Sequence, residues 1–337
     1  MKTDKYLILI LKFSSFFIIG IFIFNSCSAP PIFKAKINDK DNSKKSKNEI
    51  NLITYNIKSV FGKNEKKLVS LSNYLNEQSF DFVLLQEVFD ESTREYLTRN
   101  FDSSTYRAII PRVDYQSFPS NICQDAGLFS ASKFPMIDLS NIDFGENTEV
   151  NNGAIQQMLI KEFSISLDFM ANKSVLGTLH HLNDSTKLFL FTTHNQAISS
   201  KRHKRIQLMQ IQAFIENAVI TVLKNGVVKS PNNLIVLLTG DLNFDAYDDD
   251  NVKMIQENLG NPRDLYNEFN PDLKEYTLII KLFNLYKRFD YIFAYDKVGQ
   301  IPLKKVKVKS INVTDVVDGN EESISDHLAI KATLAID

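Results

Sequence analysis

The chain has 337 residues, and 44% of them are hydrophobic, which is enough apolar material for one large domain or two small ones. Its 39 basic and 40 acidic side chains leave a net charge of −1, so the overall charge gives no indication of a polyanionic partner. Only two cysteines occur, Cys27 and Cys123, which excludes a disulfide-rich scaffold and a cysteine-rich zinc site. The composition also excludes a disordered chain and a collagen-like repeat.

The amino end has the pattern of an export signal. A short charged leader precedes a strongly apolar run from Tyr6 to Phe24. The run ends in Phe24-Asn25-Ser26-Cys27, and a cysteine directly after small residues resembles a bacterial lipoprotein processing site, with Cys27 as the lipidated residue. An uncleaved membrane anchor and a freely secreted form are the alternatives, since about 20 apolar residues span a bilayer. All three place the rest of the chain outside the cytoplasm.

Residues 28–48 follow with many proline, lysine, asparagine and serine residues, a composition that predicts a solvated tether. No internal repeat and no second linker of this kind divides the remainder of the sequence. We therefore expect a signal segment over 1–27, a tether over 28–48 and one monomeric domain over 49–337.

Segments with the pattern of buried strands recur along this domain. Several are near-continuous apolar runs, such as Phe82-Val83-Leu84-Leu85, as in strands that are covered on both faces. Between some of them lie helical patterns, with apolar residues three and four apart. The predicted strands are Asn51–Ile57, Asp81–Gln86, Tyr106–Pro111, Gly127–Ala131, Ala154–Phe163, Lys187–His194, Asn233–Asp241, Asp290–Tyr295, Leu303–Val313 and His327–Ala335, and the predicted helices are Glu65–Gln78, Ser92–Asn100, Lys201–Leu223 and Asn251–Leu259. Together they predict two packed sheets with helices outside.

Acidic, amide and imidazole side chains lie at the ends of these strands, where stability requires only a turn-forming residue. Each has an ordinary structural explanation by itself, as a turn residue, an Asx turn or a buried histidine. Their occurrence together at the ends of separate strands is better explained by a shared site. The residues are Asn56, Glu87, His194, Asp241, Asn243, Asp290, Asp326 and His327.

In their sequence order, these motifs resemble those of the endonuclease/exonuclease/phosphatase superfamily. The motifs are Thr54-Tyr55-Asn56, Leu85-Gln86-Glu87, Gly127-Leu128 leading into Ser132-Lys133-Phe134-Pro135, Thr193-His194, Gly240-Asp241-Leu242-Asn243, Phe289-Asp290-Tyr291 and Ser325-Asp326-His327. The resemblance covers nearly the whole chain after the tether. It implies an α/β (α+β) fold, the four-layered αββα sandwich of DNase-I-like proteins, and a phosphoric diester hydrolase activity.

A metal site is expected from the chemistry of such a reaction. A phosphodiester is anionic and resists attack by water, so the site needs a hard cation at the phosphoryl oxygens and a base for the water. Mg²⁺ prefers oxygen ligands and retains several waters, so one or two carboxylates are enough, with Mn²⁺ or Co²⁺ as alternatives. The predicted metal ligands are Glu87, with Asn56 beside it, and Asp326 in a supporting position.

The resemblance also implies roles for the remaining residues. His327 is the expected general base, and Asp290 is the partner that fixes its tautomer and raises its basicity. Asp241 and Asn243 are expected to orient the attacking water and hold the phosphate. His194 is expected to donate a hydrogen bond to the phosphate or the leaving group.

Three segments favour a lipid phosphodiester as the substrate. Glu87-Val88-Phe89-Asp90, Thr193-His194-Asn195-Gln196-Ala197 and the helical residues 205–211 resemble the corresponding stretches of bacterial sphingomyelinases. Export and lipidation also suit a substrate met at a membrane surface. The leading hypothesis is therefore a metal-dependent sphingomyelin phosphodiesterase, lipid-anchored to the cell envelope or secreted, that releases ceramide and phosphocholine.

The likeness to sphingomyelinases has one departure. Secreted toxins of that family carry an aromatic-tipped hairpin shortly before the final Ser-Asp-His, whereas residues 311–325 of this chain contain no aromatic residue. The apolar segments 278–280 and 282–286 are an alternative contact with a membrane, but we expect them to form a core strand.

Two other functions stay open. An exported DNase-like endonuclease is the first, because 201–205 is a dense basic cluster and lysines alternate along 304–309. We favour the simpler explanation of these segments, as the solvated start of a helix and as an exposed edge strand kept soluble by its lysines. A surface lipoprotein that binds lipid or matrix without catalysis is the second, but such a protein should have lost acids or histidines from the set, and none is lost.

Overall fold

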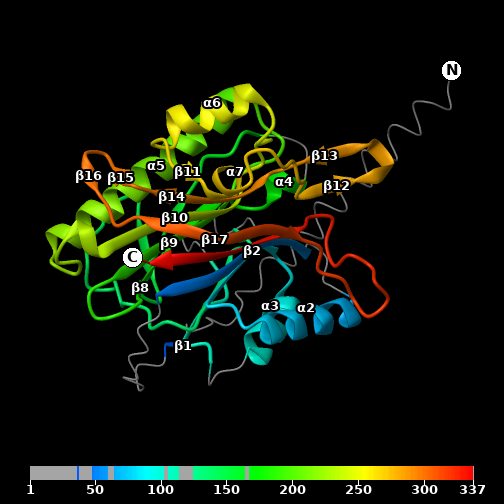
Figure 1. Ribbon diagram of the computed structural model, residues 1–337, viewed down its shortest axis with the longest axis horizontal. Coiled ribbons are helices and arrows are strands. Elements are labelled where there is room, and N and C mark those ends of the chain that lie inside the picture. Colours follow the sequence, from blue (N-terminus) through cyan, green and yellow to red (C-terminus); the bar gives the residue numbers. More distant parts are fainter. Residues whose placement is uncertain are drawn as a thin grey trace.

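Two facing β-sheets, with helices on both outer sides, make up the protein (Figure 1). The computed structural model describes residues 36–37, 48–59, 64–101, 105–113, 124–163 and 167–336. The predicted four-layered αββα sandwich is confirmed. The predicted signal segment, with Cys27, lies outside the described residues, as does Cys123.

The first sheet has seven strands in the order β1-β4-β5-β3-β2-β18-β17. They are β1 (Lys36–Ile37), β2 (Glu49–Ser59), β3 (Phe82–Val88), β4 (Ala108–Ile110), β5 (Phe129–Ser132), β17 (Val306–Thr314) and β18 (Ala329–Ile336). β2 and β3 are parallel, and β18 runs antiparallel to β2. Helices α2 (Glu65–Gln78) and α3 (Glu91–Asn100) cover its outer face, and each begins after a capping side chain, Asn64 and Asp90 respectively.

The second sheet also has seven strands, in the order β11-β14-β10-β9-β8-β7-β6. They are β6 (Glu149–Asn151), β7 (Ala154–Met158), β8 (Ser174–His181), β9 (Lys187–His194), β10 (Leu234–Asp241), β11 (Arg263–Asp264) and β14 (Asp290–Tyr295). β10 is parallel to β9 and antiparallel to β14. Helices α5 (Lys201–Lys224) and α6 (Asp249–Asn258) lie on its outer side (Figure 1). The smaller elements are α4 (Leu167–Met170), α7 (Leu265–Phe269), the 3₁₀ turns Pro231–Asn233 and Lys281–Phe283, and the hairpins β12 (Leu278–Ile280) to β13 (Leu285–Lys287) and β15 (Lys297–Val298) to β16 (Ile301–Pro302).

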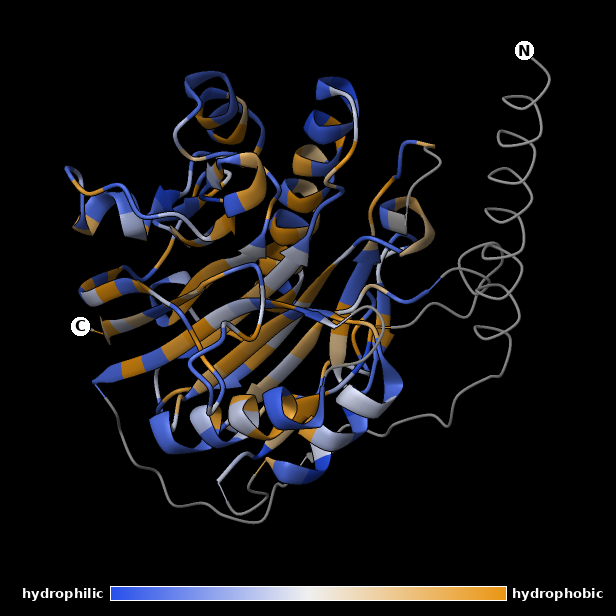
Figure 2. Ribbon diagram, turned by 90° about the vertical axis from the view of Figure 1, so that its right-hand side faces the viewer, coloured by the Kyte–Doolittle hydropathy of each residue, from blue (hydrophilic) through white to orange (hydrophobic). Residues whose placement is uncertain are grey.

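The central strands read as continuous apolar runs because both of their faces are covered. Leu52 and Leu84 of the first sheet meet Leu190 and Leu237 of the second sheet in the core between the sheets. Neighbouring residues such as Ile53 point the other way and pack beneath α2 and α3. Figure 2 shows the resulting pattern, with hydrophobic residues along the inner strands and hydrophilic residues on the outer sides of the helices.

Helix α5 is long and apolar enough to cross a membrane when judged by length and composition alone. Its residues Leu208, Ile211, Phe214 and Ile215 are buried against the second sheet. Helix α5 is therefore a helix of the outer layer whose apolar face packs against the second sheet.

Strand β8 is absent from the sequence prediction although it lies near the middle of the second sheet. Gly177 and the histidines His180 and His181 interrupt its apolar run, which hides the strand pattern. Gly177 is required by packing, because a Cβ atom there would lie 2.7 Å from the ring of Phe191. Strand β7 ends at Met158, short of the predicted end at Phe163.

The expectation that residues 278–286 form a core strand is wrong. The chain reverses through a 3₁₀ turn, with Asn284 in the left-handed region at φ 50°, and makes the separate hairpin β12–β13. Leu278 is buried, but the tip of the hairpin is exposed. Residues 36–37 of the predicted tether are also ordered in the fold, since β1 pairs with β4.

Candidate metal and catalytic site

Strand register gathers three predicted site residues in one row at the end of the second sheet. Asp241, the last residue of β10, is paired with His194 at the end of β9 and with Asp290 at the start of β14. All three side chains are buried. Because neighbouring strands lie about 4.8 Å apart and opposed residues point to the same face, the register alone brings these side chains together.

Asn56 and Glu87 come from the first sheet, at the ends of the parallel strands β2 and β3. Glu87 has a φ of 55° and Lys58 a φ of 49°, in the left-handed region that non-glycine residues seldom adopt. Backbone strain of this kind gathers at functional sites. The Asn56 Nδ2 group donates to Glu87 Oε1 and to Asp241 Oδ2, both at 2.9 Å, so it joins the two sheets at the site.

The orientation of Asn56 differs from the predicted role of a metal ligand. Its Oδ1 accepts the backbone N–H of Lys58 at 3.0 Å, so the amide nitrogen, not the oxygen, faces the two carboxylates. Reversing the amide would set two donors against each other. In this arrangement Asn56 holds Glu87 and Asp241 together.

His194 completes a group of three potential metal ligands. Its Nε2 lies 3.6 Å from Glu87 Oε1 and 3.9 Å from Asp241 Oδ2, and one ligand atom from each of the three residues lies within 4.8 Å of the others. Burial, with smaller effects from the charges of Lys173 and His327, holds the pKa of His194 well below its usual value. The imidazole is therefore neutral, which is the form that binds metals.

His327 and Asp290 form a second group with Asp241. The His327 Nδ1 atom lies 2.9 Å from Asp290 Oδ2, while its Nε2 lies 3.8 Å from Asp241 Oδ2. Burial by itself would lower the pKa of His327, but the carboxylates of Asp290, Asp241 and Asp326 raise it to about 10. One ring nitrogen is thus held by Asp290, and the other faces Asp241.

The buried carboxylates of Asp241 and Asp290 lie side by side, an arrangement that a bound cation would stabilise. Burial, followed by the negative charge of Asp290, raises the pKa of Asp241 to about 7, although the charge of His327 and the hydrogen bonds from Asn56 and Asn243 oppose the rise. Asp290 Oδ1 is buried and has no hydrogen-bond partner among the described residues. Because buried like charges repel, a bound divalent cation would stabilise the pair. Glu87, His194 and Asp241 are the residues that would hold it.

Asn243 has a structural role in this arrangement. Its backbone N–H donates to Asp241 Oδ1 at 2.8 Å, and its Nδ2 donates to the carbonyl oxygen of Asn195 at 2.9 Å. Gly240 precedes this turn with a φ of 123°, and a Cβ atom there would lie 2.1 Å from the carbonyl oxygen of Thr193. Only glycine therefore permits β10 to approach β9 closely at the site.

Asp326 stands apart from both groups of ligand atoms found in the described parts of the chain. Its carboxylate forms an ion pair with Lys58. The neighbouring Ser325 hydroxyl donates to the carbonyl oxygen of Asn56 at 2.8 Å and accepts the backbone N–H of His327 at 3.2 Å. The Ser-Asp-His segment is thereby fastened to β2, which sets His327 beside Asp241.

Lys173 is a residue of the site that sequence analysis missed. Its buried Nζ forms a 2.7 Å ion pair with Asp168, and its charge contributes to the low pKa of His194. Lys173 directly precedes β8, whose first residue, Ser174, is paired with His194. A lysine directly before a buried strand could have pointed to this residue. The strand that follows it, β8, is however concealed in the sequence pattern.

The basic segments that suggested a nucleic-acid contact bind mainly to the protein itself. Lys201, Lys204 and Arg205 contact oxygen atoms of Asp250, Asn243 and Asn258, respectively. Strand β17 is the edge of the first sheet, and its lysines are accompanied by acids: Lys305 pairs with Asp296, and Lys309 with Glu49. The explanation as a helix start and an edge strand is therefore supported.

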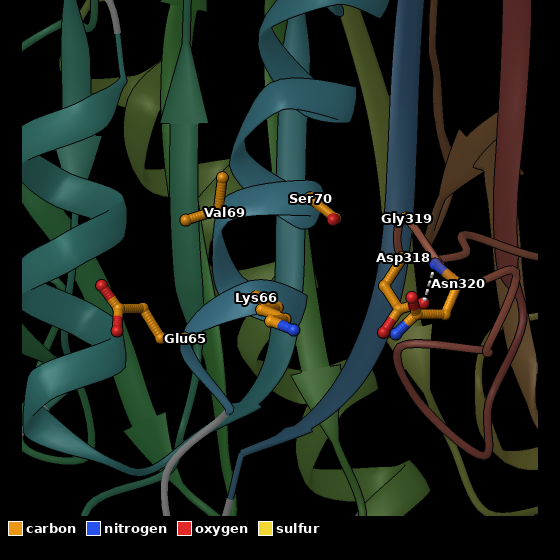
Figure 3. Close-up of a pocket in the computed structure, with 7 residues that line it drawn as sticks. All are labelled: Glu65, Lys66, Val69, Ser70, Asp318, Gly319 and Asn320. Atoms are coloured by element: carbon orange, nitrogen blue, oxygen red, sulfur yellow. Dashed lines mark hydrogen bonds between the residues drawn. The ribbon is translucent and has the colours of Figure 1, made fainter.

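A separate cavity of about 420 Å³ lies between the start of α2 and the turn at residues 318–320 (Figure 3). Its lining residues are Glu65, Lys66, Val69, Ser70, Asp318, Gly319 and Asn320. The Asp318 carboxylate there accepts the backbone N–H groups of Asn320 and Glu322. None of the predicted site residues lines this cavity, so it has no direct part in the chemistry.

Comparisons of sequence give little beyond this geometry. No protein-family model matches the sequence. An uncharacterized protein of Dictyostelium discoideum is 25% identical over 219 residues, a region that covers 59% of this chain and 16% of that protein's length. This match assigns neither a family nor an activity.

Solved structures with a similar fold cover most of the chain. Sphingomyelinase C from Streptomyces griseocarneus has a TM-score of 0.55 at 17% identity and covers 85% of this chain and 99% of its own. A beta toxin variant from Staphylococcus aureus with bound magnesium ions has a TM-score of 0.54 at 20% identity, with coverages of 84% and 99%. TDP2 from D. rerio, in complex with a single-strand DNA product, has a TM-score of 0.55 at 16% identity, with coverages of 86% and 99%. At these identities the likeness establishes the fold, and it confirms the DNase-I-like architecture that the motifs implied.

Proposed function

We propose that the protein is a divalent-metal-dependent phosphodiesterase. The observation that carries the proposal is the convergence of Glu87, His194 and Asp241 from three strands of two sheets, with the His327–Asp290 pair against the same Asp241 oxygen. Such a set combines hard oxygen ligands, a neutral imidazole and an oriented proton carrier. These are the groups that hydrolysis of a phosphodiester by water requires.

The position of each residue indicates its role in the reaction. Glu87, with Asp241 and His194, would hold the cation, which when bound neutralises phosphoryl oxygens and lowers the pKa of the neighbouring imidazole. His327 accepts the proton of the attacking water at Nε2, because Asp290 holds the opposite ring nitrogen. Asn56 keeps the carboxylates of Glu87 and Asp241 at a fixed separation.

Positive and donor groups surround the place where the phosphate would lie. Lys173 is buried beside the His194 strand, and Lys58 lies beside the Asp326 carboxylate. Each of these lysines is paired with a carboxylate, Lys173 with Asp168 and Lys58 with Asp326, so an anionic substrate would meet the lysines together with those acids. The neutral imidazole of His194 carries one N–H group, which would donate to the phosphate or the leaving group in the role expected from the sequence.

Sphingomyelin is the substrate that we propose within this class. The segments 87–90 and 193–197, which resemble those of bacterial sphingomyelinases, are the ones that carry Glu87 and His194 in the site. The fold likeness extends to a sphingomyelinase C, although it extends equally to a DNA-bound TDP2. Part of the basic charge of residues 201–205 is also paired within the protein, which weakens the case for a nucleic-acid partner.

Product analysis with competing substrates tests the proposal. Vesicles of sphingomyelin and phosphatidylcholine, plasmid DNA and single-stranded DNA are offered together to the full-length protein, with Mg²⁺ or with a chelator. We expect ceramide and phosphocholine only, abolished by the chelator and by His327→Ala. His181→Ala is the matched control, because His181 is exposed at the opposite end of the β8–β9 pair from His194.

The other outcomes are equally informative. Cleavage of DNA without release of phosphocholine would show that the protein is a nuclease and would exclude sphingomyelin as its substrate. If His327→Ala and His181→Ala have equal activity, the proposed catalytic site is wrong. Vesicle binding with no hydrolysis of any substrate in Mg²⁺, Mn²⁺ or Co²⁺ would support the binding protein without catalysis.

We also propose that the chain is exported and lipidated at Cys27. The support is the apolar run that ends in Phe24-Asn25-Ser26-Cys27, together with the suitability of a membrane-anchored enzyme for a lipid substrate. Cys27→Ser should move the protein from the membrane fraction to a soluble or unprocessed form. An unchanged distribution and an unchanged mass of the amino-terminal peptide would contradict lipidation.

A further inference from the structure

The hairpin β12–β13 exposes large apolar side chains at its tip. Leu282 is 86% exposed and Phe283 is 74% exposed. Tyr286, on the returning strand, is also exposed, and its ring contacts that of Tyr276 at a centroid distance of 5.6 Å. In Figure 1 the hairpin projects from the body of the protein beside the loop that leads into β18. Two neighbouring apolar side chains held in solvent require an explanation, since single exposed ones are ordinary.

The base of this hairpin is attached to the proposed catalytic residues. Thr277 accepts the backbone N–H of Leu328 at 2.6 Å through its carbonyl oxygen, and its hydroxyl accepts the backbone N–H of Asp290 at 3.2 Å. The Ile279 N–H donates to the carbonyl oxygen of Asp326 at 3.2 Å. The position of the tip relative to His327 is therefore fixed by backbone hydrogen bonds.

A second pair of exposed apolar side chains borders the site on the His194 side. Phe163 is 76% exposed and Ile198 is 61% exposed. Their segments are joined, because the backbone N–H of Glu162 donates to Gln196 Oε1 at 2.8 Å and Gln196 Nε2 donates back at 2.9 Å. Phe163 and Ile198 thus belong to segments attached on the His194 side of Asp241, whereas the hairpin is attached on the His327 side.

The chemistry of the tip matches the interface of a lipid bilayer. Lys281 and Asn284 flank Leu282 and Phe283, so a cation and an amide adjoin two apolar side chains. In the interface, apolar side chains enter the acyl region while lysine reaches the phosphate groups. A tip of two side chains is far too small for a stable protein interface, which buries roughly 1,200 Å² or more in total.

We propose that the tip of the β12–β13 hairpin, residues 281–284, docks the protein on a phospholipid bilayer and places the site at the head groups. The inference rests on the proposed function for its purpose, but the docking itself is measured without catalysis. Leu282 and Phe283 enter the acyl region, Lys281 meets lipid phosphates, and Phe163 and Ile198 belong to the segments attached on the His194 side.

The absence of tryptophan from the chain permits a direct test. Phe283→Trp introduces a single tryptophan at the tip, and Met209→Trp introduces one at a half-exposed position on helix α5 as the matched control. Each full-length variant is titrated with vesicles of phosphatidylcholine and sphingomyelin, with and without brominated acyl chains. We expect a blue shift and strong quenching by brominated lipid for Phe283→Trp, and neither change for Met209→Trp. Emission at residue 283 that stays at the solvent-exposed wavelength with saturating vesicles would overturn the proposal.

A second variant connects docking with turnover. Leu282→Ser combined with Phe283→Ser should lower hydrolysis of sphingomyelin in vesicles about tenfold or more, while hydrolysis of a water-soluble phosphodiester stays within about twofold. Equal losses on both substrates would mean that the hairpin supports the site and does not dock it. If the wild-type protein hydrolyses neither substrate, the proposed function fails, but the tryptophan measurement still decides whether the hairpin enters the bilayer.

Discussion

Replacing Asp290 with asparagine should return His327 to an ordinary imidazole. The raised pKa of His327, about 10 against a usual 6.5, corresponds to roughly 5 kcal/mol in favour of its protonated form. Unit charges about 4 Å apart interact by about 4 kcal/mol at an effective dielectric constant of about 20, so one carboxylate in hydrogen-bond contact accounts for most of this energy. Asp290→Asn should therefore lower the pKa of His327 by about 3 pH units in the metal-free protein. With metal present, phosphodiester turnover should fall about 10²- to 10⁴-fold, because the imidazole loses its orienting partner.

Nuclear magnetic resonance of the ring nitrogens measures this directly. The His327 signal is assigned by its loss in His327→Gln and is titrated from pH 5 to 11 in chelator. Asp296→Asn is the control, since Asp296 directly follows the same strand but pairs with Arg263 and Lys305 away from the site. The reasoning is refuted if the pKa of His327 stays near 10 in Asp290→Asn, or if both variants change the rate equally.

Three further changes test other parts of the structure. Gly240→Ala should destabilise the fold by about 3 kcal/mol or more, because its Cβ would meet the Thr193 carbonyl; a loss in thermal unfolding below about 1 kcal/mol would contradict the close approach of β9 and β10. Lys173→Met should lower the free energy of unfolding by about 3 kcal/mol, because it leaves Asp168 without its 2.7 Å partner. Adding Asp168→Leu to that variant should restore part of the loss in urea unfolding. If the two substitutions instead lower stability additively, the buried pair is excluded. Burial lowers the pKa of His180 to about 3, so below about pH 6.5 the unfolded chain binds a proton that the folded chain does not. The free energy of unfolding should therefore fall by up to about 1.4 kcal/mol per pH unit toward pH 3. His180→Leu should flatten that slope, and an unchanged slope would show that His180 is not its source.

The layers of the fold are readable from the sequence because the central strands obey one simple constraint. Strand 234–241 is apolar at each of its first five positions, Leu234 to Leu238, since a sheet or a helix layer covers each face. Predicted bounds for Lys187–His194 and Asp290–Tyr295 coincide with β9 and β14. The same logic fails for β8, where a glycine is needed for the ring of Phe191 and histidines stand at the strand end.

The members of the site follow from strand ends, but their orientations do not. Register explains why Asp241, His194 and Asp290 meet, since each ends or begins a neighbouring strand. No pattern in the sequence shows that Asn56 turns its nitrogen toward Glu87, because the backbone N–H of the following turn decides that rotation.

The hairpin β12–β13 illustrates a different limit. Its residues have the apolar composition of a core strand, and composition alone favours burial. The left-handed conformation of Asn284 turns the chain back and leaves Leu282 and Phe283 in solvent. Burial in this segment is thus decided by one turn and by attachment to Asp290 and residues 326–328, which only the three-dimensional structure reveals.

Anomalous diffraction from crystals soaked in Mn²⁺ tests the central claim most directly. The account predicts a peak about 2.1 Å from a carboxylate oxygen of Glu87, within reach of Asp241 and His194, and its loss in Glu87→Gln. Saturating Mn²⁺ with no peak at this position, or with a peak only at the surface turn of Asp318, would contradict the account.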